Sequence, residues 1–219
     1  MLVNRRQFLF IFSSIPFFRV TFTEAQSKYS ETIAVLQKAY TNEIQAHLNY
    51  LSYAEKAKLE NYPGLAHFFH FFATSESIHA RNFKQILPAL GVQAWEPLKP
   101  EIKVLSTKMN LKRALDSEML DIDQRYPQFI EKAKPENYES ALKNLNYAWE
   151  TEKQHRDLIL KMQSGTGMFF GILAKKIEAT SFQCFLCQVC GSTVMNLPDQ
   201  GCPICKNPVS AYKEVERQK

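Results

Sequence analysis

The chain has 219 residues, of which 45% are hydrophobic and 22% are charged, and its formal net charge is +5. This apolar content allows one good core with a small additional module and excludes a wholly disordered protein. The charge is modest and no run of Lys and Arg occurs, so nucleic acid is not expected as a partner.

The N-terminus has the pattern of an export signal. Arg5 and Arg6 precede an apolar run from Phe8 to Phe18, which is too short for a membrane-spanning helix of about 20 residues but suits a signal h-region. The pattern NRRQFL resembles the bacterial twin-arginine export motif. Residues 1–25 are therefore predicted as a leader that directs the protein to the periplasm, with a cytoplasmic protein as the alternative. No stable membrane span is expected.

Four segments carry apolar residues at helical spacing. They run from about Ser30 to Glu60, from Leu65 to Leu87, from Leu111 to Ala133 and from Ala141 to Met162. A connection of about 20 residues that contains Pro97 and Pro100 separates the second segment from the third. The order predicts a mainly α protein with a four-helix bundle over residues 30–163, of the crossover type that includes the ferritin-like folds.

Each predicted helix carries a carboxylate in or beside its apolar stripe. Glu43 and Glu118 belong to the first and third helices, and the second and fourth carry the pairs Glu76 with His79 and Glu152 with His155. Burying four ionised carboxylates without partners costs several kcal/mol for each, so cations are required. No Lys or Arg lies on the stripe of the second or fourth helix. A pair of divalent metal ions supplies the charge and also explains the histidines.

The spacing of these residues indicates two similar halves. Glu43 precedes Glu76 by 33 residues, and Glu118 precedes Glu152 by 34 residues. Each helical pair thus contributes one Glu and then one Glu-x-x-His, which is the pattern of carboxylate bundles that bind two irons or two manganese ions.

All five cysteines lie in one block near the C-terminus. Two knuckles, Cys187-x-x-Cys190-Gly and Cys202-Pro-x-Cys205, define a tetrahedral site of four thiolates for zinc or iron. Cys184 forms a competing Cys-x-x-Cys with Cys187, but a glycine directly after Cys190 favours the first choice because a knuckle turn needs positive φ. Cys184 is therefore predicted to be spare. Residues 164–181 are predicted as a linker and 182–219 as a small second domain.

Both parts together resemble rubrerythrin from about Ser30 to Glu216. The first ligand helix of that family is similar to NEIQAHLNY, and its two Glu-x-x-His elements are similar to ESIH and ETEKQH. Its third helix is similar to LKRALDSEMLDIDQRYP, and its rubredoxin-like tail is similar to FLCQVCG with CPICKNPVSAY. The resemblance implies that Glu43, Glu76, His79, Glu118, Glu152 and His155 hold two irons, with Glu76 and Glu118 bridging them. Tyr50 and Tyr126 would orient the carboxylates by hydrogen bonds. Asp121, a further candidate ligand, stands where the family usually has a second Glu and is one methylene shorter.

The resemblance implies a non-haem di-iron peroxidase. A reductase or small electron-carrier protein would reduce an Fe(Cys)4 site, and the electrons would pass to the di-iron centre, where hydrogen peroxide is reduced to water. The resemblance also implies a homodimer in which the rubredoxin-like domain of one subunit lies near the di-iron site of the other. An alternative is a ferroxidase or iron-handling bundle with a structural zinc ribbon, and a third possibility is an inactive binding module.

Overall fold

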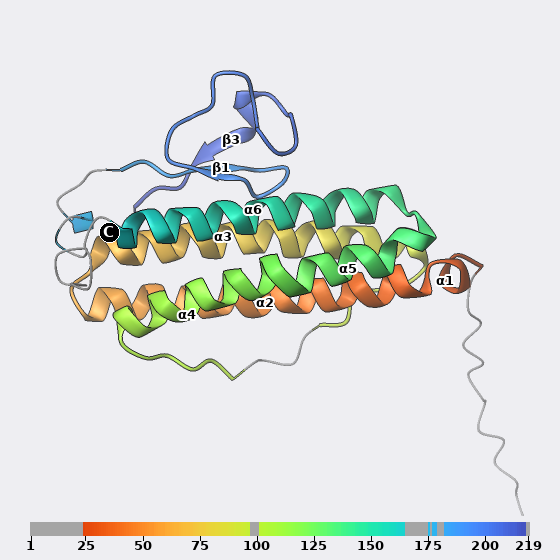
Figure 1. Ribbon diagram of the computed structural model, residues 1–219, viewed down its shortest axis with the longest axis horizontal. Helices are drawn as coiled ribbons and strands as arrows, with labels where there is room; N and C mark the ends of the chain where they lie inside the picture. The colour runs from red at the N-terminus through yellow and green to blue at the C-terminus, as the bar shows by residue number, and fades with distance from the viewer. Residues whose placement is uncertain (1–23, 97–100, 165–174, 176, 179–181, 218–219) are drawn as a thin grey trace, which may run out of the picture.

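A computed structural model describes residues 24–96, 101–164, 175, 177–178 and 182–217. After the short α1 (Glu24–Lys28), the bundle consists of α2 (Ser30–Leu59), α3 (Pro63–Ile86), α4 (Thr107–Leu120) continued by α5 (Tyr126–Ala133), and α6 (Glu139–Ser164). Short 3-10 turns, η1 (Leu87–Leu90) and η3 (Lys134–Glu136), follow α3 and α5. The long helices lie side by side (Figure 1). The predicted four-helix architecture is confirmed.

The second and third helices of the bundle are joined by the predicted long crossover. Its described parts, residues 91–96 and 101–106, lie along the outside of the bundle (Figure 1). The side chain of Ser106 accepts a hydrogen bond from the backbone N of Met109 and so caps the start of α4. The connection allows α3 and α4 to run in the orientation that a ferritin-like bundle requires.

The third helix was expected to be continuous, but a π-helical turn, η2 (Asp121–Arg125), divides it into α4 and α5. A π turn accommodates one residue more than an α turn. The turn lies between Glu118 and Glu152, which are 34 residues apart, one more than Glu43 and Glu76. It also places Tyr126, eight residues after Glu118, on the inner face that Tyr50 reaches seven residues after Glu43.

Two apolar clusters fill the bundle on either side of a polar layer. One cluster contains the phenylalanines of α3 from Phe68 to Phe72, and the other contains Leu36, Phe83 and Leu145. Along each helix the predicted metal ligands fall between members of the two clusters. The polar layer therefore lies between the two apolar clusters, and the burial of large side chains stabilises each cluster.

The C-terminal residues form a small domain beside α3 and α6 (Figure 1). Its strands β1 (Phe185–Cys187), β2 (Thr193–Val194) and β3 (Tyr212–Glu214) form an antiparallel sheet in the order β2-β1-β3, and the 3-10 turn η4 (Val209–Ala211) precedes β3. The small strands and the clustered cysteines are those of a rubredoxin-like domain, as predicted.

The small domain packs against the bundle of its own chain through hydrogen bonds, among them Ser75 Oγ to Gly191 O at 2.8 Å and Thr193 N to Gln154 Oε1 at 3.0 Å. The structure holds one chain, so the expected placement near the carboxylate site of a second subunit stays a prediction.

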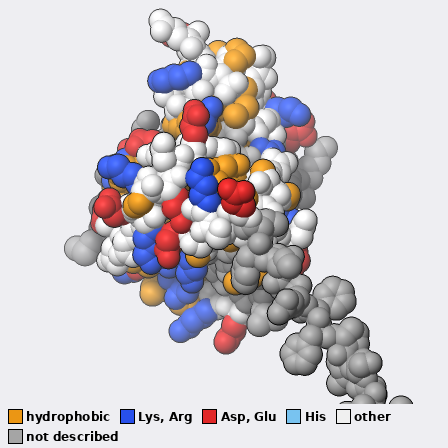
Figure 2. Space-filling view, turned by 90° about the vertical axis from the view of Figure 1, so that its right-hand side faces the viewer, with side chains coloured by type: hydrophobic (Ala, Val, Ile, Leu, Met, Phe, Trp, Pro, Cys, Tyr) orange, Lys and Arg blue, Asp and Glu red, His pale blue; other side chains and the backbone are white. Residues whose placement is uncertain are grey.

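The surface carries charges of both signs. On the face shown in Figure 2, Lys and Arg side chains lie next to Asp and Glu side chains. Within the described residues, no helix is both long and apolar enough to cross a membrane. Of the predicted leader, only Glu24 and Ala25 belong to the described residues, as the first two residues of α1.

Candidate metal centres

The predicted ligands of the carboxylate site converge from four helices into the polar layer of the bundle. They are Glu43 of α2, Glu76 and His79 of α3, Glu118 of α4, and Glu152 and His155 of α6. Each of these residues is at most 5% exposed. The spacing of three residues within each Glu-x-x-His places both side chains on the same helix face. The structure therefore brings all six together.

One group of ligand atoms surrounds the imidazole of His79. His79 Nδ1 lies 3.0 Å from Glu76 Oε2, 3.4 Å from Glu152 Oε1 and 3.6 Å from Glu43 Oε2. These four residues each place a ligand atom within 4.8 Å of the others. Donors that bind one metal at about 2 Å are spaced in this way, so the group has the size of one metal site.

A second group surrounds His155 in the same manner. His155 Nδ1 lies 3.1 Å from Glu152 Oε2, 3.2 Å from Glu76 Oε1 and 3.7 Å from Glu118 Oε2. The two groups share Glu76 and Glu152, whereas Glu118 belongs to the second group alone. In this grouping the two glutamates of the Glu-x-x-His pairs occupy the shared position, whereas the bridging role expected for Glu118 stays a prediction.

The charge balance of the cluster suits two divalent cations. Burial raises the pKa of Glu43 and Glu118 well above that of an ordinary glutamate, and neighbouring carboxylates add to this effect. Burial alone would lower the pKa of His79 and His155, but hydrogen bonds and charges from the surrounding carboxylates raise it well above the ordinary value. These directions show that the metal-free cluster takes up positive charge as protons. Such protons are displaced when a metal binds, and oxygen and imidazole donors suit iron, so the residues fit the metal pair.

Two tyrosines support the outer carboxylates. The Tyr50 hydroxyl donates to Glu118 Oε1, and the Tyr126 hydroxyl donates to Glu43 Oε1. Both tyrosines are at most 3% exposed. Each donor lies on a different helix from its carboxylate, so the two bonds tie α2 to α4 and α5 to α2. These positions match the predicted role of orienting the glutamates.

Asp121 lies near the cluster, but it belongs to neither ligand group among the described residues. Both of its carboxylate oxygens lie 3.1 Å from Arg125 Nη1. Burial, together with the charge of Glu152, raises the pKa of Asp121 to about 7 despite this ion pair. Arg125 was not predicted as part of the site, although its position four residues after Asp121 is the spacing of a helical ion pair.

A cavity of about 230 Å³ reaches the cluster from the side of α2 and α4. Its wall includes all four glutamates of the cluster, and Arg113, Asp121 and Arg125 also line it. The volume is large enough for several water molecules or a small polar substrate. The cavity lies on the opposite side from the rubredoxin-like domain, which covers α3 and α6. A small molecule and that domain therefore approach the cluster from different faces.

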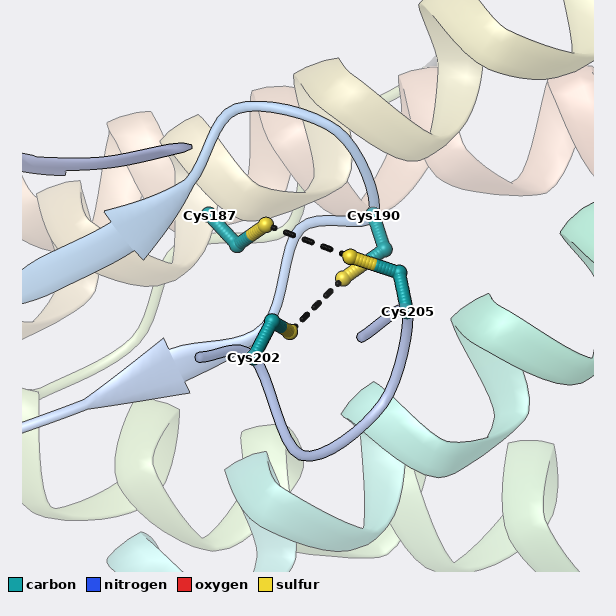
Figure 3. A group of neighbouring side chains, drawn as sticks. All are labelled: Cys187, Cys190, Cys202 and Cys205. Carbon is teal, nitrogen blue, oxygen red and sulfur yellow. Dashed lines mark hydrogen bonds between the residues drawn. The ribbon is translucent and has the colours of Figure 1, made fainter. Parts of the chain in front are cut away.

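The second candidate centre is formed by Cys187, Cys190, Cys202 and Cys205, whose sulfur atoms lie within 4.8 Å of one another. Figure 3 shows the four side chains converging from two loops. The Sγ atoms of Cys187 and Cys205 are 3.6 Å apart, and those of Cys190 and Cys202 are 3.5 Å apart. Hydrogen bonds from Cys187 and Cys190 lower the pKa of Cys202, and the same hydrogen bonds raise the pKa of Cys190. The donor set fits iron or zinc.

Cys184 lies apart from this cluster, as predicted. Its side chain is fully buried among apolar residues of the domain contact, and burial raises the pKa of its thiol to about 12. A thiol in such surroundings remains neutral and behaves as a small apolar side chain.

Comparison with known proteins agrees with this geometry. The rubrerythrin family model matches residues 34–163, the region that contains the six buried carboxylate and imidazole ligands. The chain belongs to the rubrerythrin family. Among its relatives, Rubrerythrin-2 of Clostridium acetobutylicum is 32% identical over 185 residues, which cover 81% of this chain and 93% of that protein. Nigerythrin of Nitratidesulfovibrio vulgaris is 24% identical over 190 residues, which cover 86% of this chain and 89% of that protein.

Solved structures show the same fold. The fully reduced, all-ferrous state of nigerythrin has a TM-score of 0.70 at 24% identity and covers 84% of this chain and 86% of that chain. The bacterioferritin of Desulfovibrio desulfuricans has a TM-score of 0.65 at 21% identity and covers 72% of this chain and 92% of that chain. This rubrerythrin-family chain therefore combines a carboxylate and histidine site of the di-iron type with a separate four-cysteine site.

Proposed function

We propose that this rubrerythrin-family protein is a non-haem di-iron peroxidase that reduces hydrogen peroxide to water. The observation that supports this most strongly is the buried pair of overlapping ligand groups, which a cavity connects to the outside. Reduction of one hydrogen peroxide to two waters consumes two electrons and two protons. Bound iron would supply the electrons by changing between its ferrous and ferric states.

The six ligands are assigned by the two groups that they form. Glu43 and His79 would hold one iron, and Glu118 and His155 would hold the other. Glu76 and Glu152, which both groups share, would bind both irons. The apolar clusters on either side of this layer exclude bulk water, so hydrogen peroxide would enter by the cavity between α2 and α4.

The four cysteines would hold a single iron that receives electrons from a reductase or a small electron-carrier protein. Thiolate ligands suit both iron and zinc, but only iron changes its oxidation state and passes electrons onward. We propose iron because the four-cysteine domain packs on the side of the bundle that presents α3 and α6, each of which supplies a Glu-x-x-His pair. A homodimer remains part of the proposal.

The test combines metal analysis with reoxidation kinetics. The full chain, produced with iron, is reduced under anaerobic conditions and mixed with either hydrogen peroxide or dissolved oxygen. We expect three irons per chain, and we expect peroxide to restore the ferric-thiolate absorption much faster than oxygen does. Zinc at the cysteines, or faster oxidation by oxygen with continued uptake of added ferrous iron, would instead establish a ferroxidase or iron-handling protein.

Export to the periplasm is a separate proposal that depends on the twin-arginine pattern, because residues 1–23 lie outside the described part of the chain. A reporter that is active only after twin-arginine export is fused behind residues 1–30. We expect reporter activity that is lost when Arg5 and Arg6 are both replaced by Lys. Absence of activity in the unaltered fusion would favour the cytoplasmic alternative.

A further inference from the structure

The cavity at the carboxylate cluster opens between α2 and α4, on the side of the bundle away from the small domain (Figure 1). Its charged groups change from the surface inward. Arg113 is exposed and the Arg125 side chain is 37% exposed, whereas the Asp121 side chain is 15% exposed. The side chains of the four cluster glutamates are at most 6% exposed. A solute that enters by the cavity therefore passes two guanidinium groups before it reaches the glutamates.

The two arginines differ in how their charge is balanced. Arg125 forms an ion pair with Asp121, whose carboxylate oxygens both lie 3.1 Å from Arg125 Nη1. Arg113 Nε instead donates to the hydroxyl of the buried Tyr53 at 3.3 Å. Among the described residues, Arg113 forms no ion pair with a carboxylate. The bond to Tyr53 thus holds the Arg113 guanidinium beside the entrance, where no neighbouring carboxylate neutralises its charge.

The remaining polar side chains on the wall carry no charge. Asn42, Gln45 and Asn49 of α2 and Ser117 of α4 line the cavity, and Gln45 Nε2 donates to Asn49 Oδ1 at 2.9 Å. Amide and hydroxyl groups both donate and accept hydrogen bonds, so they suit a small neutral molecule such as hydrogen peroxide. Outside the ligand cluster, the described wall carries the charges of two arginines and one aspartate, which leaves one positive charge unbalanced.

This unbalanced charge matters most once the cluster is filled. Two ferrous ions would balance the four glutamates, because each ion carries two positive charges. Arg113 then determines the sign of the net charge along the cavity. A further cation at the entrance is repelled by this charge, whereas an uncharged molecule is affected far less.

We propose that Arg113 is a specificity-determining residue, which admits neutral hydrogen peroxide to the carboxylate site and slows the entry of divalent cations. For its substrate this inference rests on the proposed function, but the slowing of cation entry can be measured without any turnover. The same charge distinguishes this cavity from that of an iron-handling protein, which must admit ferrous ions repeatedly.

A series of charges at position 113 tests the slowing of cation entry. The full-length variants Arg113→Lys, Arg113→Gln and Arg113→Glu are freed of metal, and zinc is added to fill the four-cysteine site. Uptake of Co²⁺ into the carboxylate site is then followed by absorbance in stopped flow at low salt, where charges are least screened. We expect uptake to be about threefold faster in Arg113→Gln and about tenfold faster in Arg113→Glu, within the range known for charged clefts. Arg113→Lys keeps the charge and should stay close to the unaltered protein.

The matched control is Lys112→Gln. Lys112 is the neighbouring cation on α4, but it pairs with Asp116 and does not line the cavity. This variant changes the net charge of the chain by the same amount as Arg113→Gln, and we expect its Co²⁺ uptake to match that of the unaltered protein. Equal uptake rates across the Arg113 series would overturn the proposal, and so would an equal acceleration in Lys112→Gln.

A second measurement separates this proposal from the proposed function. The iron-loaded, reduced proteins are mixed with hydrogen peroxide, and we expect the oxidation rate to vary across the Arg113 series by less than the rate of Co²⁺ uptake. Oxidation rates that vary as much as the uptake rates would overturn the role in specificity. The expected order of Co²⁺ uptake in proteins that do not react with peroxide would count against the proposed function alone. Fast oxidation by peroxide together with equal Co²⁺ uptake would leave the peroxidase in place and overturn the role of Arg113.

Discussion

Arg125 binds both carboxylate oxygens of Asp121, each at 3.1 Å, across the π-helical turn that follows Glu118. This ion pair explains why a carboxylate so close to the cluster belongs to neither ligand group. Asp121 lies on the wall of the cavity, whereas Glu43 and Glu118 each belong to one ligand group.

The role of Asp121 can be tested by metal content. We expect Asp121→Asn to keep the full iron content of the carboxylate site, because Asp121 belongs to neither ligand group among the described residues. Glu118→Gln is the matched comparison from the same helix and should lose bound iron, since an amide is a poor replacement for an iron-binding carboxylate. Iron analysis after extensive dialysis provides the measurement. Equal losses of iron in the two variants would show that Asp121 is also a ligand.

The same aspartate should make the metal-free protein sensitive to pH. The pKa of Asp121 is raised from 3.8 to about 7 in the folded state, mainly by burial. A raised folded-state pKa contributes stability that is fully present below the unfolded pKa and is lost as the pH rises through the folded pKa. With a chelator present, the Tm of the unaltered chain should therefore fall relative to that of Asp121→Asn between about pH 4 and pH 7. A difference in Tm that stays constant over this range would contradict the assignment.

The two tyrosines that contact the outer glutamates should affect metal binding. Tyr50→Phe and Tyr126→Phe each remove one hydroxyl donor from a buried carboxylate while keeping the ring in place. We expect iron affinity or peroxide turnover to fall roughly 10- to 100-fold, as is usual for groups that orient metal ligands. Tyr53→Phe is the control, because Tyr53 is equally buried but its hydroxyl contacts Arg113 instead. If all three variants behave alike, the hydroxyl contacts to the glutamates are not the cause.

Substitutions in the four-cysteine cluster and at the spare Cys184 should have different effects on metal binding and on stability. Cys202→Ala should abolish the ferric-thiolate absorption, because it removes one of four ligands. Cys184→Ala should keep that absorption and lower the free energy of unfolding by about 1 kcal/mol, the cost of a small cavity. Optical spectra and denaturant unfolding provide the two readouts. Loss of the absorption in Cys184→Ala would show that the neighbouring Cys184 and Cys187 form the first knuckle instead.

Much of the fold and of the site can be predicted from this sequence because helical periodicity places buried carboxylates and imidazoles on apolar stripes. That pattern identified Glu43, Glu76 and Glu152 without any knowledge of the fold. Periodicity does not reveal a single added residue, so the π turn after Leu120 was missed even though the spacings of 33 and 34 differ by one.

Other features depend on how the helices meet, and no single segment of sequence contains that information. The membership of Glu152 in both ligand groups, and of Glu118 in one, depends on how α6 and α4 pack together. The contact of Gly191 with His79, where an added Cβ atom would lie 2.8 Å from His79 Cδ2, depends on hydrogen bonds between two domains. Gly191 was predicted from its turn alone, and its second constraint, the approach to an imidazole, appears only in three dimensions.

The most direct test of the account is a peroxide titration of the fully reduced, iron-loaded chain under anaerobic conditions, with both iron sites followed by absorbance and Mössbauer spectra. We predict that each hydrogen peroxide consumed oxidises two ferrous irons without release of oxygen, and that the cysteine-bound iron becomes ferric in the same reaction. Consumption of peroxide with the cysteine-bound iron still ferrous, or with oxygen released, would contradict a peroxidase that draws its electrons from the four-cysteine site.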